Sequence, residues 1–192
     1  MLFAFVRFLW EGYERLFVRF AVLDAVEPEG DNLIFVRLIR YRGEPVTLPD
    51  GTTLKAGDWA GEIHFHSHTL ANFHPEREYR GSTTKLAVVT LRRTRQSLRH
   101  LAQYVSGSEK YRPAQVFFGK TLLYRGAQGL GFTVTELPSG REKLFLLIYL
   151  RWLLVVYHPK GWGRLSDNSA ALVPKGVWIS RKQLLQEYLE DT

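Results

Sequence analysis

The residues best suited to chemistry alternate along one short segment and are Glu62, His64 and His66. Side chains at positions i, i+2 and i+4 of a strand share a face, so a strand here would bring the carboxylate and both imidazoles together. His68 would join them if the strand continued. Imidazole nitrogens and carboxylate oxygens bind zinc, iron, nickel or copper. A polar strand face in contact with water is the favoured interpretation of this spacing, and a metal site is the alternative.

A basic face is predicted on the segment 84–105, where apolar residues recur at the spacing of an α-helix. Arg92, Arg95 and Arg99 would share one side of this helix and meet the phosphates of lipid or nucleic acid. No recognised nucleic-acid-binding motif accompanies them, so nucleic acid is the weaker partner, and a solvated helix face explains them equally well. The side predicted to be buried carries Ala87, Leu91, Leu98, Leu101 and Val105.

The composition excludes several classes of site. Because the chain has no cysteine, disulfides, thiolate zinc sites and cysteine nucleophiles are ruled out. The formal net charge of +7 favours anionic partners, although a basic surface also serves solubility. The N-terminus does not have the pattern of a signal peptide, and no apolar stretch is long enough to span a bilayer. We therefore expect a cytoplasmic protein, with a peripheral position at the inner face of the membrane as one option.

Two segments, 2–22 and 144–157, are predicted helices that carry more apolar surface than one sheet face requires. We expect them to pack in the core. In the alternative, part of the first helix is exposed and contacts a membrane, a partner protein or a second copy of the chain. The residues that would make this contact are Phe3, Phe8, Leu9 and Trp10.

The order of elements predicts an α+β fold, a two-layer arrangement of a mixed β-sheet with helices packed on it, in a single domain over 1–192. Gly51, in the sequence Pro49-Asp50-Gly51, supplies the left-handed residue of a hairpin turn. The expected strands are 33–41, 45–54, 61–66, 114–119, 132–137 and 176–179.

The clearest unit is the segment 114–137, which is predicted as a strand, a short helix over 121–129 and a second strand. Gly131 stands where a helix end needs a left-handed residue. A strand–helix–strand unit favours parallel pairing of its two strands with a right-handed crossover. Near the C-terminus, Ser180 opens a capping box for a final helix over 181–190.

A resemblance to the YkoP-like family of bacteria rests on three segments, FVRLIRYRGEPVTLPDGTTLKAGD, GEIHFHS and FFGKTLLYRGAQGLGFTV. It extends from the N-terminal helix to at least Tyr157. Members of this family occur alone and as an extra domain on some polysaccharide deacetylases, so the resemblance implies a cell-envelope context. It implies no established activity and no functional residues, although the family's Ile-His-x-His segment matches His64 and His66.

Together these patterns favour a non-catalytic accessory or binding protein that docks on an anionic membrane surface or on envelope-synthesis proteins. The alternative is a metal-dependent enzyme that uses His64 and His66. Nucleic-acid binding is the weaker third hypothesis, and a homodimer is compatible with all three. Whether the protein is an enzyme, and which cofactor it would use, stays open at this point.

Overall fold

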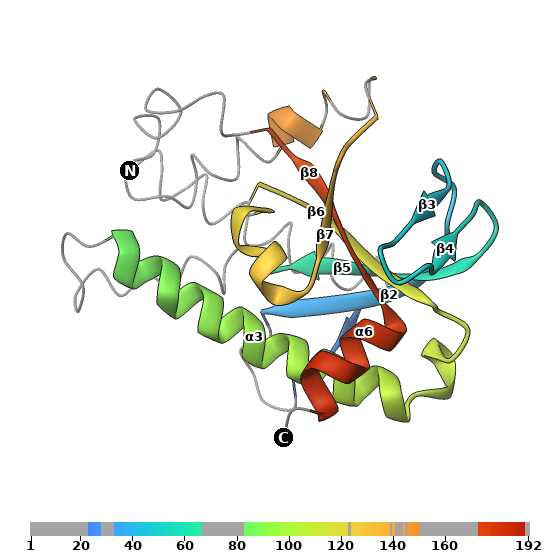
Figure 1. The fold of residues 1–192 in the computed structure, drawn as a ribbon, viewed down its shortest axis with the longest axis horizontal. Coiled ribbons are helices and arrows are strands. Elements are labelled where there is room, and N and C mark those ends of the chain that lie inside the picture. Colours follow the sequence, from blue (N-terminus) through green and yellow to red (C-terminus); the bar gives the residue numbers. More distant parts are fainter. Residues whose placement is uncertain are drawn as a thin grey trace, which may run out of the picture.

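The computed structural model describes residues 23–27, 33–66, 83–122, 124–138, 140, 144, 146–149 and 173–190 of the 192-residue chain. Six of the described strands form one mixed sheet in the order β1-β2-β5-β6-β8-β7 (Figure 1). Within it, β5 and β6 pair in parallel, and every other neighbouring pair is antiparallel. The strands are β1 (Asp24–Ala25), β2 (Ile34–Arg40), β5 (Trp59–Phe65), β6 (Val116–Thr121), β7 (Thr133–Glu136) and β8 (Lys175–Ser180).

Two helical segments pack on one face of this sheet. The long helix α3 (Thr83–Gly107) connects the parallel pair β5 and β6, while α6 (Arg181–Leu185) follows β8 and continues as the π-helical turn η5 (Gln186–Glu190). Figure 1 shows α3 and α6 on the same side of the sheet. Their core with the sheet contains Ile34, Val36, Ile63, Leu98, Leu101, Val105, Phe117 and Leu184. The predicted α+β fold, a mixed sheet with helices packed on it, is confirmed.

The predicted start of the final helix is also confirmed. The Ser180 side chain accepts a hydrogen bond of 3.0 Å from the backbone N–H of Gln183, which satisfies one of the free donors of the first turn.

A small hairpin covers part of the opposite face. Its strands β3 (Val46–Thr47) and β4 (Thr53–Leu54) form a separate two-stranded sheet, joined by a turn in which Gly51 has a φ of 84°. The turn was expected, but the placement of 45–54 in the main sheet is wrong. After β2 the chain leaves the main sheet, because the apolar side chains of the hairpin pack against the open face of that sheet and form a second core with it. This core contains Tyr41, Leu48, Leu54, Ala60, Val116, Phe118 and Trp178.

The segment after β6 differs from the prediction in two ways. In place of one helix over 121–129 there are two 3₁₀ turns, η2 (Tyr124–Gly126) and η3 (Gln128–Leu130), since the glycines in this stretch weaken a regular helix. The two strands β6 and β7 run parallel, as predicted, because both are antiparallel to β8, but the predicted pairing between them is wrong, since β8 lies between them. From Gly176 to Ser180 every residue of β8 is buried, so this strand needs an interior position, whereas β7 is only partly buried and takes the edge.

Tyr111 lies in the 3₁₀ turn η1 (Glu109–Tyr111), which connects α3 to β6, and its side chain contacts the strands β1 and β2 at the edge of the sheet. Its side chain is fully buried, and its hydroxyl shares its single proton between two acceptors, the Asp24 carboxylate at 2.6 Å and the Val36 carbonyl at 3.0 Å. Its own carbonyl oxygen accepts a hydrogen bond from Arg181, which also donates to Val105 near the end of α3. Burial, and then the hydrogen bond and charge of Asp24, raise the pKa of Tyr111 well above its ordinary range, so the hydroxyl stays a donor.

The two apolar segments of the prediction fall mainly outside the described residues. This holds for the whole of 2–22, with its candidate contacts Phe3, Phe8, Leu9 and Trp10. Of 144–157, residues 144 and 146–149 are described and are helical. Leu144 and Ile148 are 58% and 61% exposed, so this short stretch is not fully packed in the core. Within the described part of the chain, no helix combines the length and the apolar character needed to cross a membrane.

Gly131 gives a test of the turn that ends η3. It has a φ of 79°, as predicted, and a Cβ atom there would also meet the carboxylate of Glu187. We expect Gly131→Ala to lower the free energy of unfolding by about 1–2 kcal/mol, because a left-handed backbone costs an L-residue that much. Gly129→Ala is the matched control, since its φ is not left-handed and no atom lies within 4 Å of the added Cβ. Urea denaturation with equal midpoints for the two variants would contradict this account.

Candidate functional site

Arg37 of β2 and Glu62 of β5 form an ion pair on the sheet face that points away from α3. Val36 and Ile63 pair in the antiparallel register and both enter the helix-covered core, so their neighbours Arg37 and Glu62, also paired, must face the other way. Alternation along β5 places His64 on the same side as Glu62. The register of two strands therefore assembles a site from residues far apart in the chain.

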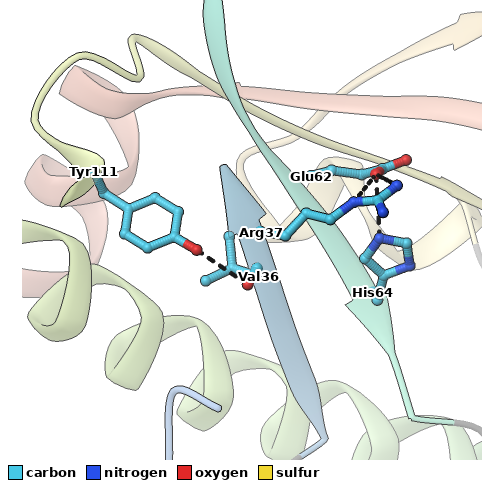
Figure 2. A network of polar contacts seen from close by, with 5 residues as sticks. All are labelled: Val36, Arg37, Glu62, His64 and Tyr111. Atoms are coloured by element: carbon cyan, nitrogen blue, oxygen red, sulfur yellow. Dashed lines mark hydrogen bonds and ion pairs between the residues drawn. The ribbon is translucent and has the colours of Figure 1, made fainter. Parts of the chain in front are cut away.

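The contacts of this site converge on one atom. Arg37 Nε and Nη2 donate hydrogen bonds of 2.8 and 2.5 Å to Glu62 Oε2, and His64 Nε2 lies 3.2 Å from the same oxygen (Figure 2). The side chains are only partly exposed, at 34% for Arg37, 18% for Glu62 and 25% for His64. Partial burial of this kind strengthens the electrostatic interactions by limiting the screening of water.

These neighbours determine the charge of Glu62. Burial by itself raises the pKa of this carboxyl, but the hydrogen bonds and charges of His64 and Arg37 outweigh it and lower the pKa to about 2. The carboxylate therefore stays ionised at physiological pH. It serves as a fixed negative charge that orients the guanidinium and the imidazole.

His66 lies just beyond the end of β5 and takes a different environment. Its backbone N–H donates to the Leu33 carbonyl at 3.0 Å, and its ring packs edge-on against Phe35, with the ring centres 5.6 Å apart. The structure thus brings together two of the three predicted metal ligands, Glu62 and His64. No group of three or more metal-binding side chains is found among the described residues, which include 33–66 but not His68. Metal binding stays a prediction.

Arg37 is the member of the site that sequence reasoning missed. The signal was available in the alternation of the segment 33–41, which places Arg37 opposite the apolar face of a strand. Finding its partner required knowing that β2 pairs with β5 and in which register, and neither follows from a single strand pattern.

The second candidate, the basic face of α3, is exposed. Arg92, Arg95 and Arg99 all lie at the surface, and Arg95 Nη2 donates a hydrogen bond of 3.2 Å to the carbonyl of Gly129. Their binding of an anion stays a prediction.

Leu91 was expected in the core, and this is wrong, since it is 38% exposed. A 25-residue helix is about 37 Å long, whereas a seven-residue strand spans about 23 Å, so part of α3 overhangs the sheet (Figure 1). Leu91 and Val88, which is 42% exposed, lie in the N-terminal half of α3. Both lie at helical spacing from the arginines, so the five residues form one exposed stripe, the α3 stripe: Val88, Leu91, Arg92, Arg95 and Arg99.

The low pKa of Glu62 gives a pH-dependent test. A pKa of about 2 in the folded protein, against an ordinary 4.5, means that the carboxylate stabilises the fold fully above about pH 4.5 and loses this effect as the pH falls towards 2. The difference in free energy of unfolding between wild type and Glu62→Gln should therefore shrink over this range, by up to about 3 kcal/mol. Denaturant titrations at several pH values measure it.

Glu136→Gln supplies the control for this test, because Glu136 forms a cross-strand pair with Lys175 at 2.6 Å but is 65% exposed. Water screens such a pair, so its difference from wild type should stay small at every pH. A difference for Glu62→Gln that does not change with pH would refute the assigned electrostatics.

Comparison with known proteins finds a similar protein and a matching family. The protein named "Uncharacterized protein YkoP" from Bacillus subtilis (strain 168) is 26% identical over 181 residues, which cover 94% of each chain. No solved structure matches the chain. The family described as the YkoP domain matches residues 4–188, and the chain therefore belongs to the YkoP domain family.

Proposed function

We propose that this protein is a non-catalytic accessory or binding protein of the cell envelope, which docks on an anionic membrane surface through α3. The observation that carries the proposal is the α3 stripe, where two exposed apolar side chains and three exposed arginines share one side of the helix. An anionic bilayer offers phosphates for the arginines and an apolar boundary for Val88 and Leu91.

The arrangement of charge along the stripe supports a membrane more than a small anion. The arginines follow one another at spacings of three and four residues, so they extend along the helix instead of converging on one point. A surface of phosphates matches such a row, and each basic residue near an anionic leaflet contributes about 1 kcal/mol. The net charge of +7 adds a long-range attraction towards the same surface.

The state of Glu62 supports the non-catalytic part of the proposal. A general acid or base works best when its pKa lies near the operating pH, and a carboxyl with a pKa of about 2 is far from this range. The same carboxylate is already engaged by Arg37, which would compete with a metal ion or a substrate proton for it. We therefore assign Glu62 to binding and to the positioning of its neighbours.

Co-sedimentation with liposomes tests the docking. The protein should bind vesicles of phosphatidylcholine mixed with phosphatidylglycerol, should bind pure phosphatidylcholine weakly, and should be released by salt. The double variant Arg92→Glu/Arg99→Glu should lose affinity by about 30-fold or more, because at least about 2 kcal/mol of attraction is removed.

The matched control is Arg42→Glu/Lys55→Glu, which makes the same change in net charge at exposed positions near the β3–β4 hairpin. It should retain most of the binding. Equal losses in both double variants would mean that net charge alone drives adsorption, and a wild-type protein that ignores both vesicle types would refute the docking. Preferential, salt-sensitive binding of single-stranded or duplex nucleic acid would favour the nucleic-acid hypothesis instead.

A metal-dependent enzyme is the second candidate, and the contact between Glu62 and His64 favours it. A carboxylate that bonds one nitrogen of an imidazole orients the ring, as partners of metal-bound histidines do. In this alternative, His64 and His66 would be ligands and Glu62 an outer partner.

Metal analysis by mass spectrometry separates the two candidates. If our proposal is right, protein purified without chelator should hold far less than one transition-metal ion per chain and should take up none tightly on titration. A stoichiometric metal that disappears in His64→Ala/His66→Ala would replace the non-catalytic proposal by the enzyme.

A further inference from the structure

The Glu62 carboxylate uses only one of its two oxygens within the described structure. Arg37 Nε, Arg37 Nη2 and His64 Nε2 all approach Oε2, and no hydrogen bond from a described residue reaches Oε1. Figure 2 shows this second oxygen pointing away from both neighbours. An acceptor on a side chain that is only 18% exposed gains from a well-placed donor more than a fully solvated one does.

The Arg37 guanidinium has unused donors beside this acceptor. A guanidinium carries five N–H groups in one plane, and the contacts with Glu62 engage only Nε and Nη2. The outer edge, formed by Nη1 and the remaining Nη2 proton, has no partner among the described residues. Since the pair is held by two hydrogen bonds, its donors and its free acceptor keep a fixed relation to each other.

An aromatic residue lies on the same sheet face, two residues along the strands from the pair. Phe35 lies two residues before Arg37 on β2, pairs with His64 across the strands, and is partly exposed. The ring of His66 packs edge-on against it, which restricts how the phenyl group can turn. The site therefore combines an apolar wall with an adjacent donor and acceptor.

The charges of the site favour a neutral ligand. Glu62 and Arg37 already neutralise each other, so a ligand carboxylate would compete with Glu62 and a ligand ammonium would compete with Arg37. A neutral ligand avoids the cost of removing a further charge from water. A hydroxyl group both donates and accepts, and two hydroxyls on neighbouring carbons can serve Oε1 and the guanidinium edge together.

We propose that Arg37 and Glu62 form a binding site for a neutral saccharide ring, which they hold through two neighbouring hydroxyl groups while the C–H face of the ring packs on Phe35. This site lies on the sheet face opposite α3, and the proposal is independent of membrane docking. A single ring with two such contacts should bind weakly, with a Kd on the order of 1–10 mM.

A two-dimensional ¹H–¹⁵N NMR titration of the full-length protein tests the site directly. The probes are methyl β-D-glucopyranoside and methyl α-D-mannopyranoside, whose neighbouring hydroxyls have trans and cis arrangements. At least one should shift the amide signals around Phe35, Arg37 and Glu62 in a saturable way. Cyclohexanol, a ring with one hydroxyl, and glycine, a zwitterion, should bind there at least 10-fold more weakly.

Two variants probe the polar contacts without removing the polar character of either position. Arg37→Lys keeps the charge but loses the planar fork, and Glu62→Gln keeps the shape but replaces an anionic acceptor by an amide. Each should weaken saccharide binding at least 10-fold, while Glu136→Gln, in the Lys175–Glu136 pair of the same sheet, should leave it unchanged.

Several results would overturn the proposal. These are no shifts at the highest soluble saccharide concentration, shifts confined to another surface, equal binding of cyclohexanol, tighter binding of glycine, or unchanged binding in both variants. The mapping on wild-type protein decides the matter even if a variant folds poorly. Folded Arg37→Lys should still bind anionic liposomes, so a failure of the saccharide site is distinguishable from a failure of membrane docking.

Discussion

The hydrogen bonds of one buried side chain, Tyr111, hold together the parts of the fold on which the polar site depends. Its hydroxyl joins Asp24 of β1 to Val36 of β2, and its carbonyl accepts from Arg181 at the start of α6. Lys110 adds an ion pair of 2.5 Å to Asp24. Because β1 has only two residues, it forms few backbone hydrogen bonds with β2. The contacts of the Tyr111 hydroxyl with Asp24 and Val36 therefore help to hold these two strands together at the edge of the sheet.

This constraint on β2 extends to the face that carries the site. A strand that slips by one residue exchanges its two faces, so Val36 would leave the core and Arg37 would enter it. The bond from Tyr111 to the Val36 carbonyl opposes that slip at the residue next to Arg37. The contact between Arg37 and Glu62 thus depends on a hydrogen bond made on the other side of the strand, within the helix-covered core.

The two candidate surfaces use arginine in different ways. On the sheet, Arg37 is fixed by a carboxylate, which favours recognition of a ligand with a defined geometry. On α3 the three arginines of the stripe are spread along an exposed helix, and Arg95 donates to a neighbouring carbonyl, an arrangement that suits a surface of mobile phosphates. The two proposed ligands, a small neutral molecule and a charged membrane, require different arrangements of arginine, and the two candidate surfaces lie on opposite sides of the sheet.

The features that could be predicted from the sequence are those that depend on a few neighbouring residues, such as strands and turns. Alternation located β2 and β5 and placed Glu62 beside His64, and local backbone chemistry identified the turn at Gly51 and the left-handed Gly131. The pairing of strands could not be predicted in this way. The position of β8 between β6 and β7 follows from how much apolar surface each strand must bury, and this depends on the whole sheet. Arg37 was missed for the same reason, since its role exists only once β2 is paired with β5.

The central place of β8 has a consequence for how the chain assembles during synthesis. The strand at residues 175–180 is the last of the described strands to leave the ribosome, yet β6 and β7 meet only through it. Strands β2, β5 and β6 can pair once α3 has emerged, whereas β7 must wait without a partner in the sheet until β8 arrives. Phe118 of β6 pairs in register with Trp178 of β8, and both belong to the second core. The sheet and the second core are therefore complete only when this last strand is in place.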